Sequence, residues 1–357
     1  MHVLAYGTYQ RDYPRNAQVR SCLRGAGVDV SERHVGVWDG TREAWQAGPA
    51  TAARLALAEA RLAFSRRPAA DALLVGYPGH LDLAAARITA HGRPIVFDPL
   101  VSLYDTLVAD RRRFAPTSPV GRSLRRIDRA AFRTADIVVA DTAAHADFYA
   151  EQFGLDSGRV RVCLVGAEDR LFRPEARADE EFSVLFVGKL IPLHGLETIL
   201  AAARLAPELP FRIVGSGQLA GLLADAPPNV THVPWIEYAE LPAAIRAAGC
   251  ALGVFGTSAK ASRVIPNKAF QALACGIPLV TADTPAAREL LTDSVDSVLV
   301  PAGEPDALAA ALRALAADPT RRHEIGNAGR ATYETRASEA VLGQTWRSLF
   351  EELVGAA

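Results

Sequence analysis

Short apolar runs alternate with helical stretches along the whole chain, and no other feature of the sequence limits the possible folds as much. In the first half the predicted strands are 2–6, 28–30, 35–37, 72–75, 94–97, 137–140 and 160–165. In the second half they are 182–187, 211–214, 230–233, 251–255, 278–281 and 297–300. The predicted helices between them include 49–64, 81–91, 143–153 and 305–317. Such alternation is typical of an α/β protein whose parallel sheets are covered by helices on both faces.

A polar connector, RPEARADEE at 173–181, separates two series of strands. A chain of 357 residues exceeds one ordinary hydrophobic core, so we expect two doubly wound domains in tandem. The predicted domains are 1–175 and 182–335. The remaining segment, 336–357, is amphipathic and is expected to form a helix that can pack on either domain.

Composition excludes several classes of protein. The net charge is −1 and half of the residues are hydrophobic, so nothing favours nucleic acid as a partner. The four cysteines are scattered without paired spacing, which indicates neither a disulfide framework nor a zinc site. The first residues do not resemble a signal peptide, and no apolar run approaches the length of a transmembrane helix. We therefore expect a cytoplasmic protein, whose oligomeric state the sequence does not specify.

The stretch SRVIPNKAFQALACGIPLVTAD, at 262–283, reads as a polar loop, a short helix and a strand. Pro266 suits the first helical position, and Gly276 fits just past the helix end. A loop that opens onto a helix N-terminus presents unpaired N–H groups, which suit an anion or sugar hydroxyls. An ordinary joint between a helix and a strand explains the same pattern equally well.

Glycines end several strands of the second series, where ligands of open α/β sheets bind. FVGK at 186–189 leaves a strand, PLHG at 192–195 opens the next helix, and IVGSGQ follows at 213–218. Lys189 and His194 could bind a diphosphate there by charge. None of these is a P-loop or a full dinucleotide fingerprint, and each glycine alone is more typical of a tight turn. Their repetition favours a nucleotide–diphosphate site.

Four blocks of the second series carry a family resemblance. FVGKLIPLHGLETILAAARL, FRIVGSGQ, VIPNKAFQALACGIPLV and ARELL together resemble the donor-binding domain of retaining glycosyltransferases of family 4, which have the GT-B fold. The match covers roughly residues 182–330, and the first domain matches more weakly, through its strand pattern and the loop GTYQRDYPRN at 7–16. The resemblance implies two Rossmann-like domains facing across a cleft and a C-terminal helix that crosses back to the first domain. It also implies a nucleotide sugar held mainly by the second domain, with no metal and no further cofactor.

The same resemblance implies the donor site. The family's Gly-Arg corresponds to Gly188–Lys189, and its Lys-Gly corresponds to His194–Gly195. Two family glutamates, facing the sugar and the ribose, are replaced by Arg263 and Gln271; the amide of Gln271 can still bond ribose hydroxyls, whereas Arg263 accepts no hydrogen bond. The predicted donor-binding residues are Gly7, Gly188, Gly195, Ser216, Trp235, Ile236, Arg263, Ile265, Pro266, Asn267, Lys268 and Gln271. For Trp235 the alternatives are stacking on the base or a place in the core, and its size favours the core.

The first domain is expected to supply the acceptor side. His80 and Asp98 follow strand ends and could orient the acceptor hydroxyl or take its proton, although each could equally cap a helix. With Lys189 and His194, which would stabilise the leaving diphosphate, they form the predicted catalytic set. Weaker acceptor-side candidates are Tyr9, Arg11 and Asp105.

A basic cluster stands out within the balanced chain. Its members are Arg111, Arg112, Arg113, Arg122, Arg125, Arg126, Arg129 and Arg133. A solvated helix face is the simplest explanation, and a phosphorylated acceptor or an anionic membrane surface are the functional alternatives.

The function that these observations predict is a retaining, hexosyltransferase-like glycosyltransferase with a UDP- or GDP-linked donor. Its acceptor would be a small molecule or a natural-product intermediate. A GT-B sugar-nucleotide epimerase and a non-catalytic protein that binds nucleotide sugars are the alternatives. The replacement of both glutamates favours the non-catalytic alternative.

Overall fold

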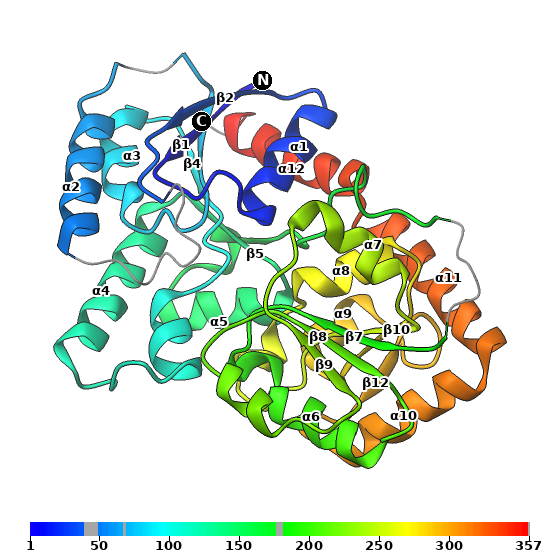
Figure 1. The fold of residues 1–357 in the computed structure, drawn as a ribbon. Coiled ribbons are helices and arrows are strands. Elements are labelled where there is room, and N and C mark those ends of the chain that lie inside the picture. Colours follow the sequence, from blue (N-terminus) through cyan, green and yellow to red (C-terminus); the bar gives the residue numbers. More distant parts are fainter. Residues whose placement is uncertain (39–48, 67–68, 176–180, 356–357) are drawn as a thin grey trace. The chain divides into compact units, whose positions relative to one another are not determined.

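The computed structural model describes residues 1–38, 49–66, 69–175 and 181–355. The chain forms two compact units, coloured by sequence in Figure 1. The first unit comprises Met1–Leu164 together with Glu339–Ala357, and the second comprises Val165–Ser338. No helix in the described ranges is long and apolar enough to span a membrane.

The first unit is built on a parallel six-stranded sheet with the order β2-β1-β3-β4-β5-β6. Its strands are β1 (His2–Gly7), β2 (Asp29–His34), β3 (Ala72–Val75), β4 (Ile95–Phe97), β5 (Ile137–Ala140) and β6 (Val160–Val162). Its helices are α1 (Pro14–Gly25), α2 (Pro49–Ala63), α3 (Asp82–Ala90), the π-helix η2 (Asp105–Asp110), α4 (Pro119–Thr134), α5 (Ala143–Phe153), the 3-10 turn η3 (Ser157–Arg159) and α12 (Glu339–Gly355). Because β1 pairs with β2 on one side and β3 on the other, the strand order reverses at β1.

Both faces of this sheet are buried, which explains why its central strands are continuously apolar. Leu4 and Tyr6 of β1 belong to the core cluster on the face covered by α2 to α5, whereas Val3 and Ala5 belong to the cluster under α1 and α12 (Figure 1). The alternation follows from the period of two residues in a strand.

Helix α12 packs closely on α1, although it comes from the far end of the chain. Trp346 is 1% exposed and stacks near Phe350, in the same core cluster as Leu23 of α1. A Cβ atom added at Gly343 would lie 2.6 Å from the Cys22 carbonyl oxygen. Only glycine therefore allows the two helices to approach this closely.

The second unit repeats the architecture, with the strand order β12-β11-β10-β7-β8-β9. Its strands are β7 (Val184–Val187), β8 (Phe211–Val214), β9 (Val230–Val233), β10 (Cys250–Leu252), β11 (Leu279–Ala282) and β12 (Val298–Val300). Its helices are α6 (Leu196–Leu205), α7 (Leu241–Arg246), α8 (Asn267–Ala274), α9 (Pro285–Leu290), α10 (Pro305–Ala317) and α11 (Pro319–Arg336), and its 3-10 turns are η4 (Pro192–His194), η5 (Ala220–Asp225), η6 (Tyr238–Glu240) and η7 (Ala261–Arg263). All of its strand pairs are parallel.

The predicted α/β class with two doubly wound sheets is confirmed, while several elements differ. Residues 35–37 form no strand; instead β2 runs to His34, through polar residues that an edge strand with one partner tolerates. Helices α9 and α11 were not predicted, because α9 is short and α11 is mostly polar.

The division between the units falls at Leu164 and Val165, earlier than the connector at 173–181. Residues just after the division are bonded within the second unit, since the Tyr333 hydroxyl contacts the Ala167 carbonyl at 3.1 Å and the Asp169 carboxylate at 2.5 Å. Part of the connector, 176–180, lies outside the described residues.

Candidate functional site

The candidate site lies in the second unit at β7, where the strand order reverses. This strand pairs with β8 on one side and with β10 on the other. In open parallel sheets, ligands bind outside the carboxyl ends of the strands at such a point.

Gly188 ends β7 in a conformation that leaves room for its neighbours. Its φ is +149°, which L side chains rarely adopt. A Cβ atom added there would lie 3.1 Å from Lys268 Nζ and 3.2 Å from His194 Cε1. Gly188, Lys268 and His194, which the sequence analysis assigned to one donor site, are therefore brought together by the fold.

Lys268 places an amino group in this site, with no anionic partner among the described residues. The residue is 8% exposed, and its ammonium group lies 3.6 Å from the ring centroid of Phe186. Among the described residues, Nζ has no hydrogen-bond partner. Burial holds the pKa of Lys268 well below its ordinary value, because removal from water disfavours the charged form. An anion entering the site would reverse that preference.

His194 is held in place by its backbone surroundings. Its Nδ1 contacts the Lys189 carbonyl oxygen, and its ring meets Phe186 edge-on at 5.5 Å between centroids. Gly195 follows with φ +67°, and a Cβ atom there would lie 2.5 Å from the Phe255 carbonyl carbon. The imidazole is thus fixed beside the lysine by a turn that only glycine can form.

The N-terminus of α8 carries Lys268 into the site. Pro266 is the N-cap residue, with φ −74° and ψ 155°, so its predicted place at the first helical position was wrong by one residue. An extended residue before the helix leaves the amides of the first turn directed outward. Ile265 is buried, Asn267 is half-buried, and Arg263 lies half-buried at the end of η7.

Sequence reasoning missed Lys260, which is 5% exposed on the loop between β10 and α8. A lysine is rarely buried unless it is paired, but nothing in the local sequence distinguishes it from a surface lysine.

Gln271 takes part in a polar group that was also missed. Tyr238 forms side-chain hydrogen bonds with both Gln271 and Glu168, and burial raises the pKa of its hydroxyl. Arg170 NH2 lies 3.2 Å from Glu168 Oε2. The amide of Gln271, 5% exposed, is therefore linked through a tyrosine to a carboxylate from a distant segment.

The residues expected near the nucleotide base of the donor lie at the β9 edge of the second sheet. Trp235 is 53% exposed and its Nε1–H donates to Glu237 Oε1 at 3.0 Å, so the prediction that it is core was wrong. It follows the edge strand β9, where no second layer covers it. Ser216 is also exposed, and Ile236 is half-buried.

In the first unit, His80 is surrounded by other protein groups. Its Nε2 lies 3.0 Å from the Val101 carbonyl oxygen and 3.6 Å from Asp128 Oδ1, and its ring packs edge-on against Phe97. Burial lowers the pKa of its imidazole despite the nearby carboxylate. These contacts favour a structural role.

Asp98 forms a buried ion pair with Arg15. Arg15 Nε lies 2.9 Å from Asp98 Oδ2, and both side chains are almost completely buried. Burial raises the pKa of Asp98, against the opposing effect of Arg15. Arg15 also donates to the carbonyl groups of Leu164 and Cys163, which joins β4 and the end of β6 through α1.

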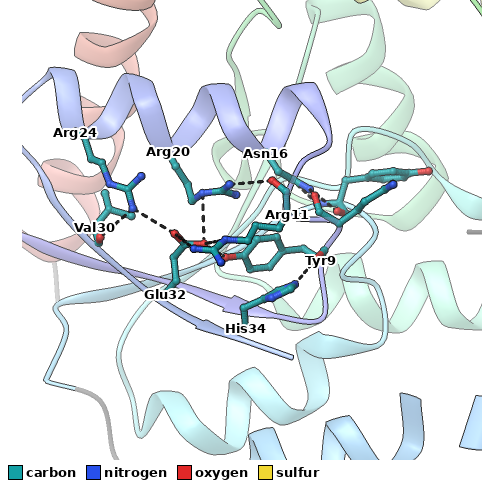
Figure 2. Close-up of polar contacts among 10 residues, drawn as sticks. Tyr9, Arg11, Asn16, Arg20, Arg24, Val30, Glu32 and His34 are labelled. Carbon is teal, nitrogen blue, oxygen red and sulfur yellow. Dashed lines mark hydrogen bonds and ion pairs between the residues drawn. The ribbon is translucent and has the colours of Figure 1, made fainter. Parts of the chain in front are cut away.

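Tyr9 and Arg11 belong to a cluster centred on Glu32, shown in Figure 2. The Tyr9 hydroxyl donates to Glu32 Oε2 at 2.8 Å, and the guanidinium groups of Arg11, Arg20 and Arg24 approach the same carboxylate within 3.2, 3.5 and 3.3 Å. Burial alone would raise the pKa of Glu32, but the Tyr9 hydrogen bond and the arginines lower it to about 2. The cluster ties α1 to the edge strand β2.

Two further candidates lie at other positions of the first unit. Asp105 is buried at the start of η2, where its N–H donates to Ser102 Oγ at 3.0 Å. Gly7, at φ +129°, gives space to the carboxylate of Asp82, which accepts the N–H and hydroxyl of Thr8. The donor role predicted for Gly7 stays a prediction.

Across the described residues, no three His, Cys, Asp or Glu side chains come together as metal ligands. All four cysteines are buried, and none of them forms a disulfide. Burial raises the pKa of the Cys250 thiol to about 12, so its reactive thiolate form is strongly disfavoured.

Solved structures establish the fold. Sucrose-phosphate synthase from Thermosynechococcus elongatus superposes with a TM-score of 0.77 at 18% identity, with 100% of both chains covered. Anabaena HepE in complex with UDP-glucose gives 0.70 at 16% identity, with 99% of this chain and 100% of that chain covered. The fold is GT-B.

Sequence relatives extend the comparison for this GT-B chain. The family described as "Glycosyl transferase-like" matches residues 195–341, which include Lys268 of the candidate site but not Gly188 or His194. A D-inositol 3-phosphate glycosyltransferase from Segniliparus rotundus is 28% identical over 256 residues, which are 65% of this chain and 56% of the relative. A GDP-mannose-dependent monoacylated alpha-(1-6)-phosphatidylinositol monomannoside mannosyltransferase from Corynebacterium glutamicum is 26% identical over 177 residues, 46% of this chain and 45% of that one. The chain spans about half the length of the curated relatives it matches.

Proposed function

We propose that this chain is a glycosyltransferase that moves a sugar from a nucleoside-diphosphate sugar to an acceptor hydroxyl, with retention of the anomeric configuration. The observation that carries the proposal is the ammonium group of Lys268, buried without an acceptor beside His194 at the end of β7. A buried cation without a partner costs folding free energy, which is expected where the missing partner is a ligand.

The leaving diphosphate gives these groups a chemical role. As the bond to the sugar breaks, negative charge develops on the departing phosphate, and groups fixed in a water-poor site stabilise that charge most strongly. Lys268, His194 and Lys189 would stabilise the negative charge on the departing phosphate, and the first amides of α8 would donate further hydrogen bonds to it. We propose that this arrangement works without a metal ion and that the chain belongs to family 4.

The remaining donor contacts follow from neighbouring side chains. Asn267 would bond the sugar, and Gln271 would bond the ribose through its amide. Both UDP and GDP stay candidates, because one solved neighbour binds UDP-glucose and one relative is named as GDP-mannose-dependent. The named acceptors of the relatives make an inositol phosphate the first acceptor to test.

A non-catalytic protein that binds nucleotide sugars is the second candidate. Arg263 stands where the resemblance implies a sugar-binding glutamate, and an arginine cannot accept a hydrogen bond from the sugar. That substitution is compatible with donor binding and unfavourable for transfer.

A thermal-shift screen tests the donor site first. The ligands are UDP, GDP, ADP and TDP with their common sugar conjugates, each with and without magnesium. A ligand that binds only the folded protein raises Tm according to RT ln(1 + [L]/Kd). A rise in Tm with the nucleotides of one base, in the absence of magnesium, supports the donor site. Turnover of the sugar conjugate of that nucleotide with an inositol phosphate supports glycosyl transfer. Binding without transfer or hydrolysis supports the second candidate, and no shift with any nucleotide contradicts both.

A further inference from the structure

Helix α4 carries a stripe of five exposed arginines that the proposed donor site does not use. Its members are Arg122, Arg125, Arg126, Arg129 and Arg133. Their spacing places them within about 100° of the helix circumference and along roughly 17 Å of its length. The helix packs on the first unit through the adjoining face, where Asp128, Ala131 and Phe132 are buried.

The stripe is a concentration of one charge. Residues 111–135 contain eight arginines and a single carboxylate, Asp128, whereas the whole chain has a net charge of −1. Asp128 is completely buried and bonded to Ser102 and to the backbone of Tyr104. The exposed side of α4 therefore presents no negative charge of its own.

Exposed arginines on α11 and α12 are paired with a carboxylate of the same helix, whereas those of α4 are not. Arg330 pairs with Glu334 on α11 at 2.7 Å, and Arg347 pairs with Glu351 on α12 at 2.8 Å, both four residues apart. On α4 the arginines stand four residues from one another instead of from a carboxylate, at positions 122 and 126, 125 and 129, and 129 and 133. In the part of the chain that the structure describes, the stripe arginines form no ion pair. Arg122 and Arg133 donate to the carbonyl oxygens of Thr117 and Phe153, and Arg125 lies over the Tyr104 ring. Like charges at this spacing destabilise a helix, so the charge pattern itself does not serve helix stability.

Apolar side chains lie at the N-terminal end of the stripe. Phe114 is 37% exposed and Val120 is 45% exposed, on either side of the capping residue Ser118. Arg112 and Arg113 are exposed beside Phe114. Basic residues flanked by exposed apolar ones are typical of a surface that lies on a lipid headgroup layer.

We propose that the exposed face of 112–133 docks on an anionic lipid bilayer and holds the protein peripherally at its surface. A convex stripe of this length suits an extended array of phosphates, whereas a single phosphorylated molecule would need converging groups in a pocket. Phe114 and Val120 give the apolar contact that a bilayer offers and a nucleic acid backbone does not. The rest of the chain carries the compensating negative charge, so an anionic surface also orients the molecule with α4 toward it.

Vesicle sedimentation tests the docking with the full-length protein. The vesicles contain phosphatidylcholine alone or with one-third phosphatidylglycerol, at low and at high salt. We expect binding to the anionic vesicles that weakens as salt rises. Equal binding to both vesicle types, or no binding to either, overturns the proposal, as does binding to duplex DNA with none to vesicles.

A charge-matched pair of variants localises the effect. The test variant carries Arg122→Gln, Arg125→Gln, Arg126→Gln and Arg129→Gln, and its partition onto anionic vesicles should fall by about 5-fold for each arginine removed. Loss of repulsion within the helix should leave Tm unchanged or raised. The control variant removes four exposed arginines elsewhere through Arg288→Gln, Arg313→Gln, Arg321→Gln and Arg347→Gln, and it should bind as the wild type does. Equal loss in both variants contradicts docking through α4. Nucleotide-induced thermal shifts should be the same in the test variant and the wild type, which separates this result from failure of the donor site.

Discussion

Lys268 keeps an ammonium group against the face of Phe186 at 3.6 Å, and a hydrogen-bond acceptor for it is absent from the described residues. Contact with an aromatic face offsets only part of the cost of removing the charge from water. Lys268 thus lowers the stability of the free protein, but it fixes an amino group at the end of β7, where an anionic ligand can bind it. A trade of this kind is characteristic of functional sites.

We therefore expect Lys268→Met to separate stability from binding. Methionine fills similar space without a charge, so Tm of the free protein should stay the same or rise. Affinity for the nucleotide found in the screen should fall at least about 10-fold, since a charge-assisted contact is lost. Isothermal titration and a thermal melt measure the two effects. Unchanged nucleotide affinity in a folded variant would remove Lys268 from the site.

Glu32 predicts how the stability of the first unit depends on pH. Its pKa falls from the ordinary 4.5 to about 2 in the folded protein, so its contribution is fully present above pH 4.5 and is lost as the pH falls from 4.5 toward 2. After allowance for screening by solvent, we expect roughly 1–2 kcal/mol. Urea unfolding of Glu32→Gln should show this loss at pH 7 and approach the wild-type value near pH 2. A constant difference between the two proteins across that range would contradict the assignment.

At the scale of elements, the contact between α1 and α12 is tight enough to exclude one methyl group. Gly343→Ala places a Cβ atom 2.6 Å from the Cys22 carbonyl oxygen, so the two helices must move apart. We expect a loss of about 1–3 kcal/mol in the free energy of unfolding. The control is Gly355→Ala in the same helix, where a Cβ atom meets nothing within 4 Å. Urea titration of both variants decides the matter, and equal stability would mean that α12 is not closely docked on α1.

The sequence predicted elements best where burial repeats with a fixed period. β3, β5, β8 and β9, and the helices α5 and α10, have the predicted bounds, because turn-forming residues flank each of them. β2 was misjudged because an edge strand has one partner and tolerates polar residues such as Glu32. The helix that carries the Arg122–Arg133 stripe was predicted only as a solvated face, since charge spacing does not reveal a capping residue.

The candidate site could be predicted in part. Its strand-end glycines and Lys268 are local signals, and the structure brings Gly188, His194 and Lys268 together. The partners of Asp98 and Gln271 could not be predicted, because Arg15 and Glu168 come from segments far away in the sequence. Pairings of this kind depend on the order of strands in the sheet.

At the scale of the whole molecule, the first unit is discontinuous, because α12 returns to it after the second unit is complete. Removal of residues 339–357 should expose the α1 face of the first unit, around Leu23, and leave the second unit intact. We expect the truncated protein to unfold in two calorimetric steps, with the step of the first unit at lower temperature. Nucleotide should still raise the temperature of the other step. A single step at the wild-type temperature would show that α12 contributes little to the first unit.

The same discontinuity has a consequence during translation. The second unit is an unbroken segment, so it can fold as soon as it has emerged from the ribosome. Most of the first unit is made earlier, yet α12, which covers one face of its sheet, is synthesised only after the second unit, a delay of roughly 10–35 s at ordinary elongation rates. During that interval the apolar surface around Leu23 and Val19 is uncovered on a nascent chain. The first unit, although most of it is synthesised before the second, therefore finishes folding after it and has the greater need of a chaperone.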